Sequence, residues 1–195
     1  MVYIENPEKD QDRVFDTFDH YKRYGQIMFK TQRIIYENIA KRVCAGSILE
    51  AGAGIGVGGH IISATTITDK LKDNVLFGKQ LYPQANWDVW DVATEPYKTR
   101  HTAVVAVEMI EHVKKYKKGI ENLIASANKE VWISTPNQIA TGESQPSNPY
   151  HVREFTPKEM LQMIGKRNVQ ILHWETFEEL DDQTLVNPLV YKITL

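Results

Sequence analysis

Two carboxylates and two histidines form the group of side chains best suited to chemistry. Glu108, Glu111 and His112 stand at positions i, i+3 and i+4 after an apolar run, and His151 lies in a polar loop after a later apolar run. A helical turn after the first run would place the first three side chains on one face. Oxygen and imidazole ligands suit Mg²⁺, Mn²⁺, Fe²⁺ or Zn²⁺, so all four residues are candidate ligands for a divalent metal.

The same group permits two interpretations without a metal. His112 or His151 could be a catalytic general base beside the carboxylates, because histidine is the side chain that titrates near neutral pH when unperturbed. Alternatively, Glu111 could cap a helix and His112 could pack with its ring bonded to a backbone carbonyl. The spacing alone leaves the catalytic, metal-binding and structural interpretations open.

A glycine-rich stretch, ILEAGAGIGVGG at residues 48–59, fits two nucleotide-binding patterns. Gly54, Gly56 and Gly59 satisfy the dinucleotide pattern G-x-G-x-x-G, in which a pyrophosphate lies against the loop. Glu50, Gly52 and Gly54 satisfy the acid-first pattern of S-adenosylmethionine (SAM) sites. The Glu50 carboxylate would repel a pyrophosphate and attract the ammonium and sulfonium groups of SAM. The stretch therefore predicts a SAM site that includes Gly52, Ala53 and Gly54.

Acidic residues close the next two predicted strands as well. Asp69 ends one of them, where its carboxylate could accept hydrogen bonds from both ribose hydroxyls of SAM. Asp91 ends the next strand and could bind the adenine amino group while Val92 packs on the ring. Taken one at a time, Asp69 and Asp91 could equally be helix caps or turn residues. Three acids in succession favour the cofactor interpretation.

Alternating apolar patterns predict the elements that position these residues. Strand-like runs occupy residues 47–50, 65–68, 86–92, 103–107, 131–134, 169–174 and 189–195, and helical patterns occupy 58–63, 71–81, 116–128 and 157–167. Such alternation is typical of an α/β fold with a mostly parallel sheet and helices on both faces. No helical pattern separates the last two runs, so the last strand is predicted to be antiparallel in a Rossmann-like, seven-stranded sheet.

The chain of 195 residues is predicted to form a single domain. Residues 1–45 are predicted to form an N-terminal arm and helices that cover the cofactor, with Tyr24 closing over it and Arg33 reaching the methionine carboxylate. An ordinary amphipathic helix packed on the sheet is the other interpretation of this segment.

The composition limits the classes of partner. A net charge of -2 gives no general attraction to nucleic acid or anionic lipid. Cys44 is the only cysteine, which excludes an internal disulfide and suits a reducing compartment. The acidic, polar N-terminus and the lack of a long apolar run predict a cytoplasmic protein with no membrane partner.

Two later motifs resemble a broad family of class I SAM-dependent methyltransferases. They read VEMIEHV at 107–113, and STPN at 134–137 followed by NPYHVREFT at 148–156. The likeness runs from about residue 33 to 165. It implies SAM as cofactor and S-adenosylhomocysteine (SAH) as product. The chain departs from the family in a short interval between Gly52 and Asp69, which predicts a clipped first helix, and in a short tail.

A similar E-x-x-E-H with a later histidine is a metal site in small-RNA terminal 2'-O-methyltransferases, and a related arrangement occurs in ubiquinone-pathway O-methyltransferases. By this resemblance, a metal at Glu108, Glu111, His112 and His151 would position and acidify a substrate hydroxyl.

The combined prediction is O-methylation of a small-molecule or glycan-like acceptor. Methylation of an RNA 2'-hydroxyl is the alternative, and four lysines after His112, at positions 114, 115, 117 and 118, would favour it. A SAM-binding regulatory protein without catalysis is the third interpretation.

Overall fold

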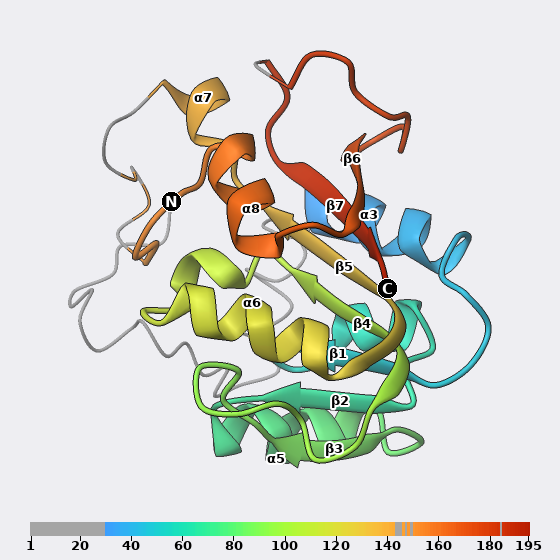
Figure 1. Ribbon diagram of the computed structural model, residues 1–195. Helices are drawn as coiled ribbons and strands as arrows, with labels where there is room; N and C mark the ends of the chain where they lie inside the picture. The colour runs from blue at the N-terminus through green and yellow to red at the C-terminus, as the bar shows by residue number, and fades with distance from the viewer. Residues whose placement is uncertain (1–29, 143–145, 147, 149, 184) are drawn as a thin grey trace.

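Seven strands form one sheet in the computed structural model, which describes residues 30–142, 146, 148, 150–183 and 185–195 (Figure 1). In chain order the strands are β1 (Ile48–Ala51), β2 (Thr66–Asp69), β3 (Asn86–Val89), β4 (His101–Val107), β5 (Ala127–Thr135), β6 (Asn168–His173) and β7 (Leu189–Thr194). Their order across the sheet is β3-β2-β1-β4-β5-β7-β6. Strands β1 to β5 pair in parallel, whereas β7 is antiparallel to both of its neighbours. The predicted Rossmann-like sheet with an antiparallel last strand is confirmed.

Helices cover both faces of this sheet, as predicted. On one face, α6 (Tyr116–Ala125) and α8 (Pro157–Ile164) pack on the central strands. On the other face lie α3 (Lys30–Ala40) and the single-turn α4 (Val57–Ile61). The central strand β4 is buried along nearly its whole length because it is covered on both sides, which explains its continuous apolar sequence. None of the described helices has the length and apolar character needed to cross a lipid bilayer.

Helix α3 is part of the core of the sheet's second face. Its buried residues are Ile35, Tyr36 and Ile39. This packing agrees with the interpretation of an amphipathic helix on the sheet. Residues 1–29, including Tyr24, lie outside the described residues.

Two aromatic rings fill spaces that glycines leave on this face. A Cβ atom on Gly58 would lie 2.1 Å from Cζ of Tyr36. A Cβ atom on Gly56 or on Gly78, in α5 (Lys72–Leu81), would lie 2.3 or 2.1 Å from the Trp87 ring. The glycines therefore let α4 and α5 approach the sheet closely.

The third strand is shorter than predicted, because it ends at Val89 rather than at residue 92. Trp90 turns inward and is buried, and Asp91 begins a turn in which its carboxylate accepts a hydrogen bond from Ala93 N at 2.8 Å. The prediction that Asp91 closes a strand was wrong for this reason. The predicted clipped first helix corresponds to α4.

Helix α8 begins with a capping box that fixes the end of the loop before it. The Thr156 hydroxyl accepts a hydrogen bond from Glu159 N at 3.2 Å, and the Glu159 carboxylate accepts one from Thr156 N at 3.0 Å. Pro157 at the first helical position suits this geometry. Because His151 lies five residues upstream, the cap restricts the path of the loop that carries it.

Candidate functional site

The glycine loop leaves the carboxyl end of β1 in a left-handed conformation. Gly52 has φ of 67° and Gly54 has φ of 56°. A Cβ on Gly52 would lie 2.1 Å from Cγ of Met109, whereas a Cβ on Gly54 would meet nothing within 4 Å among the residues that the structure describes. One side of the loop therefore packs on the segment after β4, and the backbone at Gly54 is open to a ligand.

Alanine at these two positions is expected to separate backbone strain from side-chain clash. G54A should lower the free energy of unfolding by about 1 kcal/mol, the usual penalty of left-handed backbone for a residue with a Cβ. G52A carries the same penalty and also displaces Met109, which should add roughly 1–3 kcal/mol. Urea unfolding without ligand measures both. Equal losses for the two variants would contradict the contact with Met109.

Glu50 lies fully buried beneath this loop at the end of β1. Within the described residues, neither of its carboxylate oxygens completes a well-aligned hydrogen bond, although the Tyr36 hydroxyl and the Gly59 amide lie beside them. Burial raises the pKa of Glu50 to about 8, and these two neighbours offset only part of that shift. An unsatisfied buried carboxylate fits a nearby cationic ligand, which would stabilise its charged form.

Asp69 supports the loop directly. Its Oδ2 accepts a hydrogen bond from Gly54 N at 2.8 Å, and its Oδ1 accepts bonds from Leu71 N at 2.8 Å and Asn74 Nδ2 at 3.2 Å. A carboxylate has about four acceptor sites, so Asp69 keeps room for about one further donor, where two ribose hydroxyls were predicted. Burial raises the pKa of the Asp69 carboxyl.

The other predicted cofactor residues lie in three different settings. Asp91 is exposed and binds its own turn. Val92 is buried, and its carbonyl accepts a hydrogen bond from Asn122 in α6 at 2.7 Å. Arg33 forms an exposed ion pair with Glu37 at 2.9 Å. Ala53 lies in the loop, where its N–H donates to the Thr68 carbonyl at 3.0 Å.

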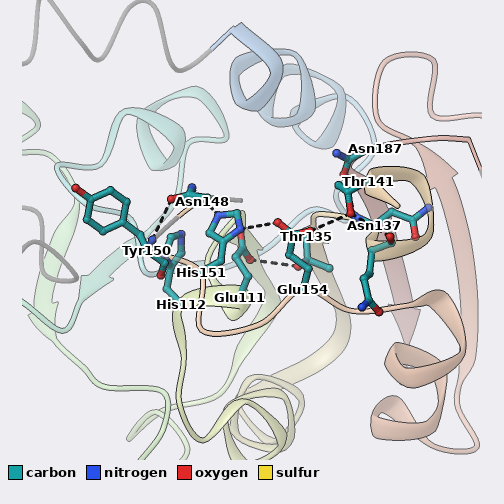
Figure 2. A network of polar contacts seen from close by, with 11 residues as sticks. Glu111, His112, Thr135, Asn137, Thr141, Asn148, Tyr150, His151, Glu154 and Asn187 are labelled. Atoms are coloured by element: carbon teal, nitrogen blue, oxygen red, sulfur yellow. Dashed lines mark hydrogen bonds and ion pairs between the residues drawn. The ribbon is translucent and has the colours of Figure 1, made fainter. Parts of the chain in front are cut away.

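The carboxyl ends of β4 and β5 bring three of the four predicted cluster residues together. A single 3-10 turn, Ile110–His112, follows β4 and carries Glu111 and His112, and the loop before α8 brings His151 to them. One ligand atom from each of Glu111, His112 and His151 lies within 4.8 Å of the others. Figure 2 shows these side chains pointing toward one another.

Glu108 lies outside this trio, although it was predicted as a ligand. It has φ of 49°, an uncommon conformation for a residue other than glycine. Its carboxylate accepts a hydrogen bond from the Ser134 hydroxyl at 2.8 Å. Burial raises the pKa of Glu108 to about 7, and the charge of Glu154 adds to the shift.

Hydrogen bonds orient both imidazole rings of the cluster. His112 Nδ1 lies 2.9 Å from the Tyr150 carbonyl, which can only accept, so the ring donates through Nδ1. His151 Nδ1 lies 2.9 Å from Oε1 of Glu154, and its Nε2 lies 2.9 Å from Asn148 Nδ2. The two ring centroids are 4.9 Å apart.

Glu111 is almost fully buried and is only half satisfied. Its Oε2 accepts a hydrogen bond from the Thr135 hydroxyl at 3.2 Å, whereas its Oε1 has no partner within the described residues. Burial and the neighbouring charges of Glu108 and Glu154 raise its pKa well above the usual range. A buried oxygen without a partner and two histidine nitrogens are a donor set that fits a divalent cation.

Two further residues of the network, Glu154 and Thr135, were not predicted from the sequence. Glu154 follows His151 at i+3 within the quoted motif, and this spacing was the available signal. Thr135 ends β5 next to Ser134, and its contact with Glu111 depends on the pairing of β4 with β5.

Comparison with known proteins gives the fold and the class. No family model matches the sequence. A probable SAM-dependent methyltransferase of Mycobacterium tuberculosis is 26% identical over 145 residues, which cover 70% of this chain and 53% of the relative. A probable SAM-dependent methyltransferase of Mycolicibacterium smegmatis is 25% identical over 152 residues, with coverage of 73% and 59%. The chain thus spans a little over half the length of these relatives.

Solved structures share the fold over most of the chain. A SAM-dependent methyltransferase from Clostridium acetobutylicum has a TM-score of 0.69 at 7% identity, with 90% of this chain and 98% of that one covered. The plantazolicin methyltransferase BpumL in complex with SAH has a TM-score of 0.67 at 14% identity, with coverage of 96% and 93%. In sequence the chain is similar to SAM-dependent methyltransferases, and it shares their Rossmann-like fold.

A third structure of the class is the methyltransferase domain of bacterial CtHen1-C, with a TM-score of 0.65 at 18% identity and coverage of 86% and 98%. In the class I fold of this chain, the glycine loop and the cluster both lie at the carboxyl edge of the parallel strands. This is the edge at which open α/β sheets bind ligands.

Proposed function

We propose that the chain transfers a methyl group from SAM to an oxygen atom of a small-molecule or glycan acceptor. The observation that carries the proposal is the contact of Gly52 with Met109, which joins the glycine loop to the segment between Glu108 and Ile110. This contact supports a cofactor loop that lies next to a cluster of acids and histidines. In-line methyl transfer needs donor and acceptor held together in this way.

The methyl donor is proposed to lie on the glycine loop. The open backbone at Gly54 faces its methionyl part, and the buried charge of Glu50 attracts its ammonium and sulfonium groups. The remaining acceptor site of Asp69 takes a ribose hydroxyl. The product SAH lacks the sulfonium charge, so release follows a loss of attraction to Glu50.

The acceptor is proposed to lie between the loop and the cluster. Its oxygen forms the new C–O bond while the C–S bond breaks with its electron pair on sulfur, and the hydroxyl proton passes to His112 Nε2, the ring nitrogen that carries the lone pair. Asn148 must turn away from His151 before that ring's Nε2 can contact an acceptor or another ligand. In the alternative with a divalent ion, Glu111, His112 and His151 would hold it, the His112 Nε2 lone pair would be used as a ligand, and the acidified acceptor hydroxyl would lose its proton to water.

Two measurements test this function. Calorimetry with SAM, SAH and NAD determines whether the loop binds the methyl donor. Incubation with tritiated-methyl SAM and fractionated extracts then determines which pool of molecules becomes labelled. Labelled small molecules or glycans support the proposal. Tight SAM binding with no labelled pool would instead support a regulatory protein, and NAD binding in place of SAM would contradict the proposal entirely.

Chelation is expected to lower the methylation rate more than tenfold if a metal occupies the cluster, because loss of the ion removes its stabilisation of the developing alkoxide. Added Mg²⁺ or Mn²⁺ should restore the wild-type rate. A variant with His112 and His151 both replaced by alanine is the control and should gain nothing from added metal. Full wild-type activity in chelator would remove the metal from the proposal and leave His112 as the base.

Methylation of an RNA end is the second candidate function, and one feature of α6 favours it. Lys114, Lys115, Lys117 and Lys118 are exposed around the N-terminus of this helix, two to six residues after His112. Cations are unfavourable at this end of a helix dipole, so a nearby anion would relieve their repulsion. The E-x-x-E-H motif resembles that of small-RNA methyltransferases. Labelling confined to the RNA pool of the extracts would select this candidate.

A further inference from the structure

Glu154 is a buried carboxylate to which the proposed reaction assigns no role. Its side chain is 6% exposed, and that of His151 is 10% exposed. Figure 2 shows the two side chains facing each other across one turn of the loop before α8. A buried carboxylate must be matched by hydrogen bonds, because desolvation of the charge costs several kcal/mol otherwise.

The hydrogen bonds around Asn148 define which nitrogen of His151 carries the hydrogen. Tyr150 N donates to Asn148 Oδ1 at 3.0 Å, which fixes the orientation of the amide. The Asn148 Nδ2 therefore faces His151 Nε2 at 2.9 Å and donates to it. Since Nε2 accepts, the neutral ring carries its hydrogen on Nδ1 and donates it to Glu154 Oε1 at 2.9 Å.

His112 has the same tautomer for a different reason. Its Nδ1 donates to the Tyr150 carbonyl, which is a backbone group. Both rings thus carry the lone pair on Nε2. The His151 tautomer instead depends on two side chains, Asn148 at Nε2 and Glu154 at Nδ1, so the effect of Glu154 alone is seen when the Asn148 amide is removed.

Glu154 is itself held in place from the other side. The Thr141 hydroxyl, at the end of α7 (Gln138–Thr141), lies 3.2 Å from Oε2 of Glu154 and 3.0 Å from the Gln138 carbonyl, and has one hydrogen to share between them. Asn137 begins α7 and is fully buried, and its amide donates to the Val186 carbonyl at 2.9 Å. The Glu154 carboxylate therefore contacts α7, and Asn137 at the start of α7 is hydrogen-bonded to the segment before β7.

We propose that Glu154 is a positioning residue, which holds the imidazole of His151 in the Nδ1–H tautomer and aims its Nε2 at Glu111 and His112. The consequence for catalysis rests on the proposed function, whereas the tautomer itself does not. The arrangement follows the general rule that a carboxylate behind a functional histidine fixes the ring and raises its basicity.

Nitrogen NMR of histidine-labelled protein tests the tautomer without an assay. The wild type should give a protonated Nδ1 and an unprotonated Nε2 for both rings. In an N148A background, which removes the amide donor to Nε2, E154A and E154N, whose shorter side chain withdraws the acceptor, should move the His151 signals toward the average of the two tautomers, whereas N148A alone should keep Nδ1 protonated. The His112 signals should stay in place and serve as an internal control. E130Q, a buried substitution elsewhere, should change neither ring.

The rate of methyl transfer supplies the second readout. E154A should lower kcat roughly 10- to 100-fold, the usual effect of removing such a carboxylate, with the KM for SAM unchanged. E154Q should recover most of the rate, because its amide oxygen can accept from Nδ1. An unchanged His151 tautomer when E154A or E154N is added to N148A overturns the proposal whatever the rates are. A changed tautomer with full kcat would overturn instead the catalytic role of His151.

Discussion

Replacement of His112 by alanine is expected to lower methyl transfer by about 10²- to 10⁴-fold, the range that general acid–base catalysis supplies. The ring has a lone pair on Nε2 because its Nδ1 donates to the Tyr150 carbonyl, so it can accept the hydroxyl proton of the acceptor. The affinity for SAM should remain unchanged, because the cofactor loop does not depend on this ring. Steady-state kinetics with the labelled acceptor and calorimetry with SAM measure the two quantities.

His60 provides the matched control for this substitution. It is an exposed histidine of α4 that stacks on Tyr82, with ring centroids 4.6 Å apart, and its Nδ1 lies 3.3 Å from Gln84 Nε2. Gln84 precedes β3, so His60 faces the edge of the sheet opposite the cluster. H60A should retain the wild-type rate. If H112A also retains it, proton transfer to His112 is excluded.

Replacement of Glu50 by glutamine is expected to weaken SAM binding at pH 8.5 by about 10- to 100-fold, the value of a hydrogen bond or close attraction to a charged group. The pKa of Glu50 is about 8 in the folded protein, so the carboxyl is largely neutral at pH 6.5. A cationic ligand favours its ionised form. Binding of SAM at pH 6.5 should therefore release close to one proton in the wild type and none in E50Q.

Calorimetry in two buffers with different ionisation enthalpies counts the released protons. E130Q is the control, because Glu130 is a buried carboxylate of β5 that accepts a hydrogen bond from Cys44 N at 2.7 Å, far from the loop in sequence. It should release as many protons as the wild type. Equal proton release by E50Q and the wild type would show that Glu50 does not interact with the cofactor.

The same substitution should change the stability of the ligand-free protein with pH. Glu50 has a raised pKa in the folded state, so between about pH 4.5 and pH 8 the folded protein binds a proton that the unfolded chain has lost. Stability falls as pH rises across this window, by up to about 1.4 kcal/mol per pH unit. E50Q lacks this decrease in the free energy of unfolding, so its stability relative to the wild type should increase as the pH rises from 5 to 8.

The sequence predicted the sheet well because its strands are short, apolar and separated by helical patterns. The predicted run at 103–107 lies within β4, and the predicted helix at 71–81 differs from α5 by one residue. The end of β3 was missed because Trp90, which lies beyond the last strand residue, Val89, continues the apolar pattern. The residue types alone could not locate the end of the strand, because Asp91, which begins the turn, is also a residue expected at the end of a strand.

The site was predicted less completely, because it depends on distances between segments far apart in the sequence. The i, i+3, i+4 spacing assumed one helical face for Glu108, Glu111 and His112. The structure instead gives Glu108 a left-handed backbone and pairs it with Ser134 on the next strand, while the turn that follows carries the other two. Thr135 joins Glu111 only through the register of β4 with β5. Such contacts have no local signature.

The seating of Trp87 against two glycines has a consequence for how homologous chains diverge. The ring occupies the space that a side chain at Gly56 or at Gly78 would need, although these positions are 22 residues apart. Any larger residue at either glycine requires a smaller one at position 87, but loss of the tryptophan frees only Gly78 to vary, because Gly56 has a left-handed φ of 82°. Positions 78 and 87 should therefore covary in homologous sequences, and glycine should persist at position 56 even where the tryptophan is replaced.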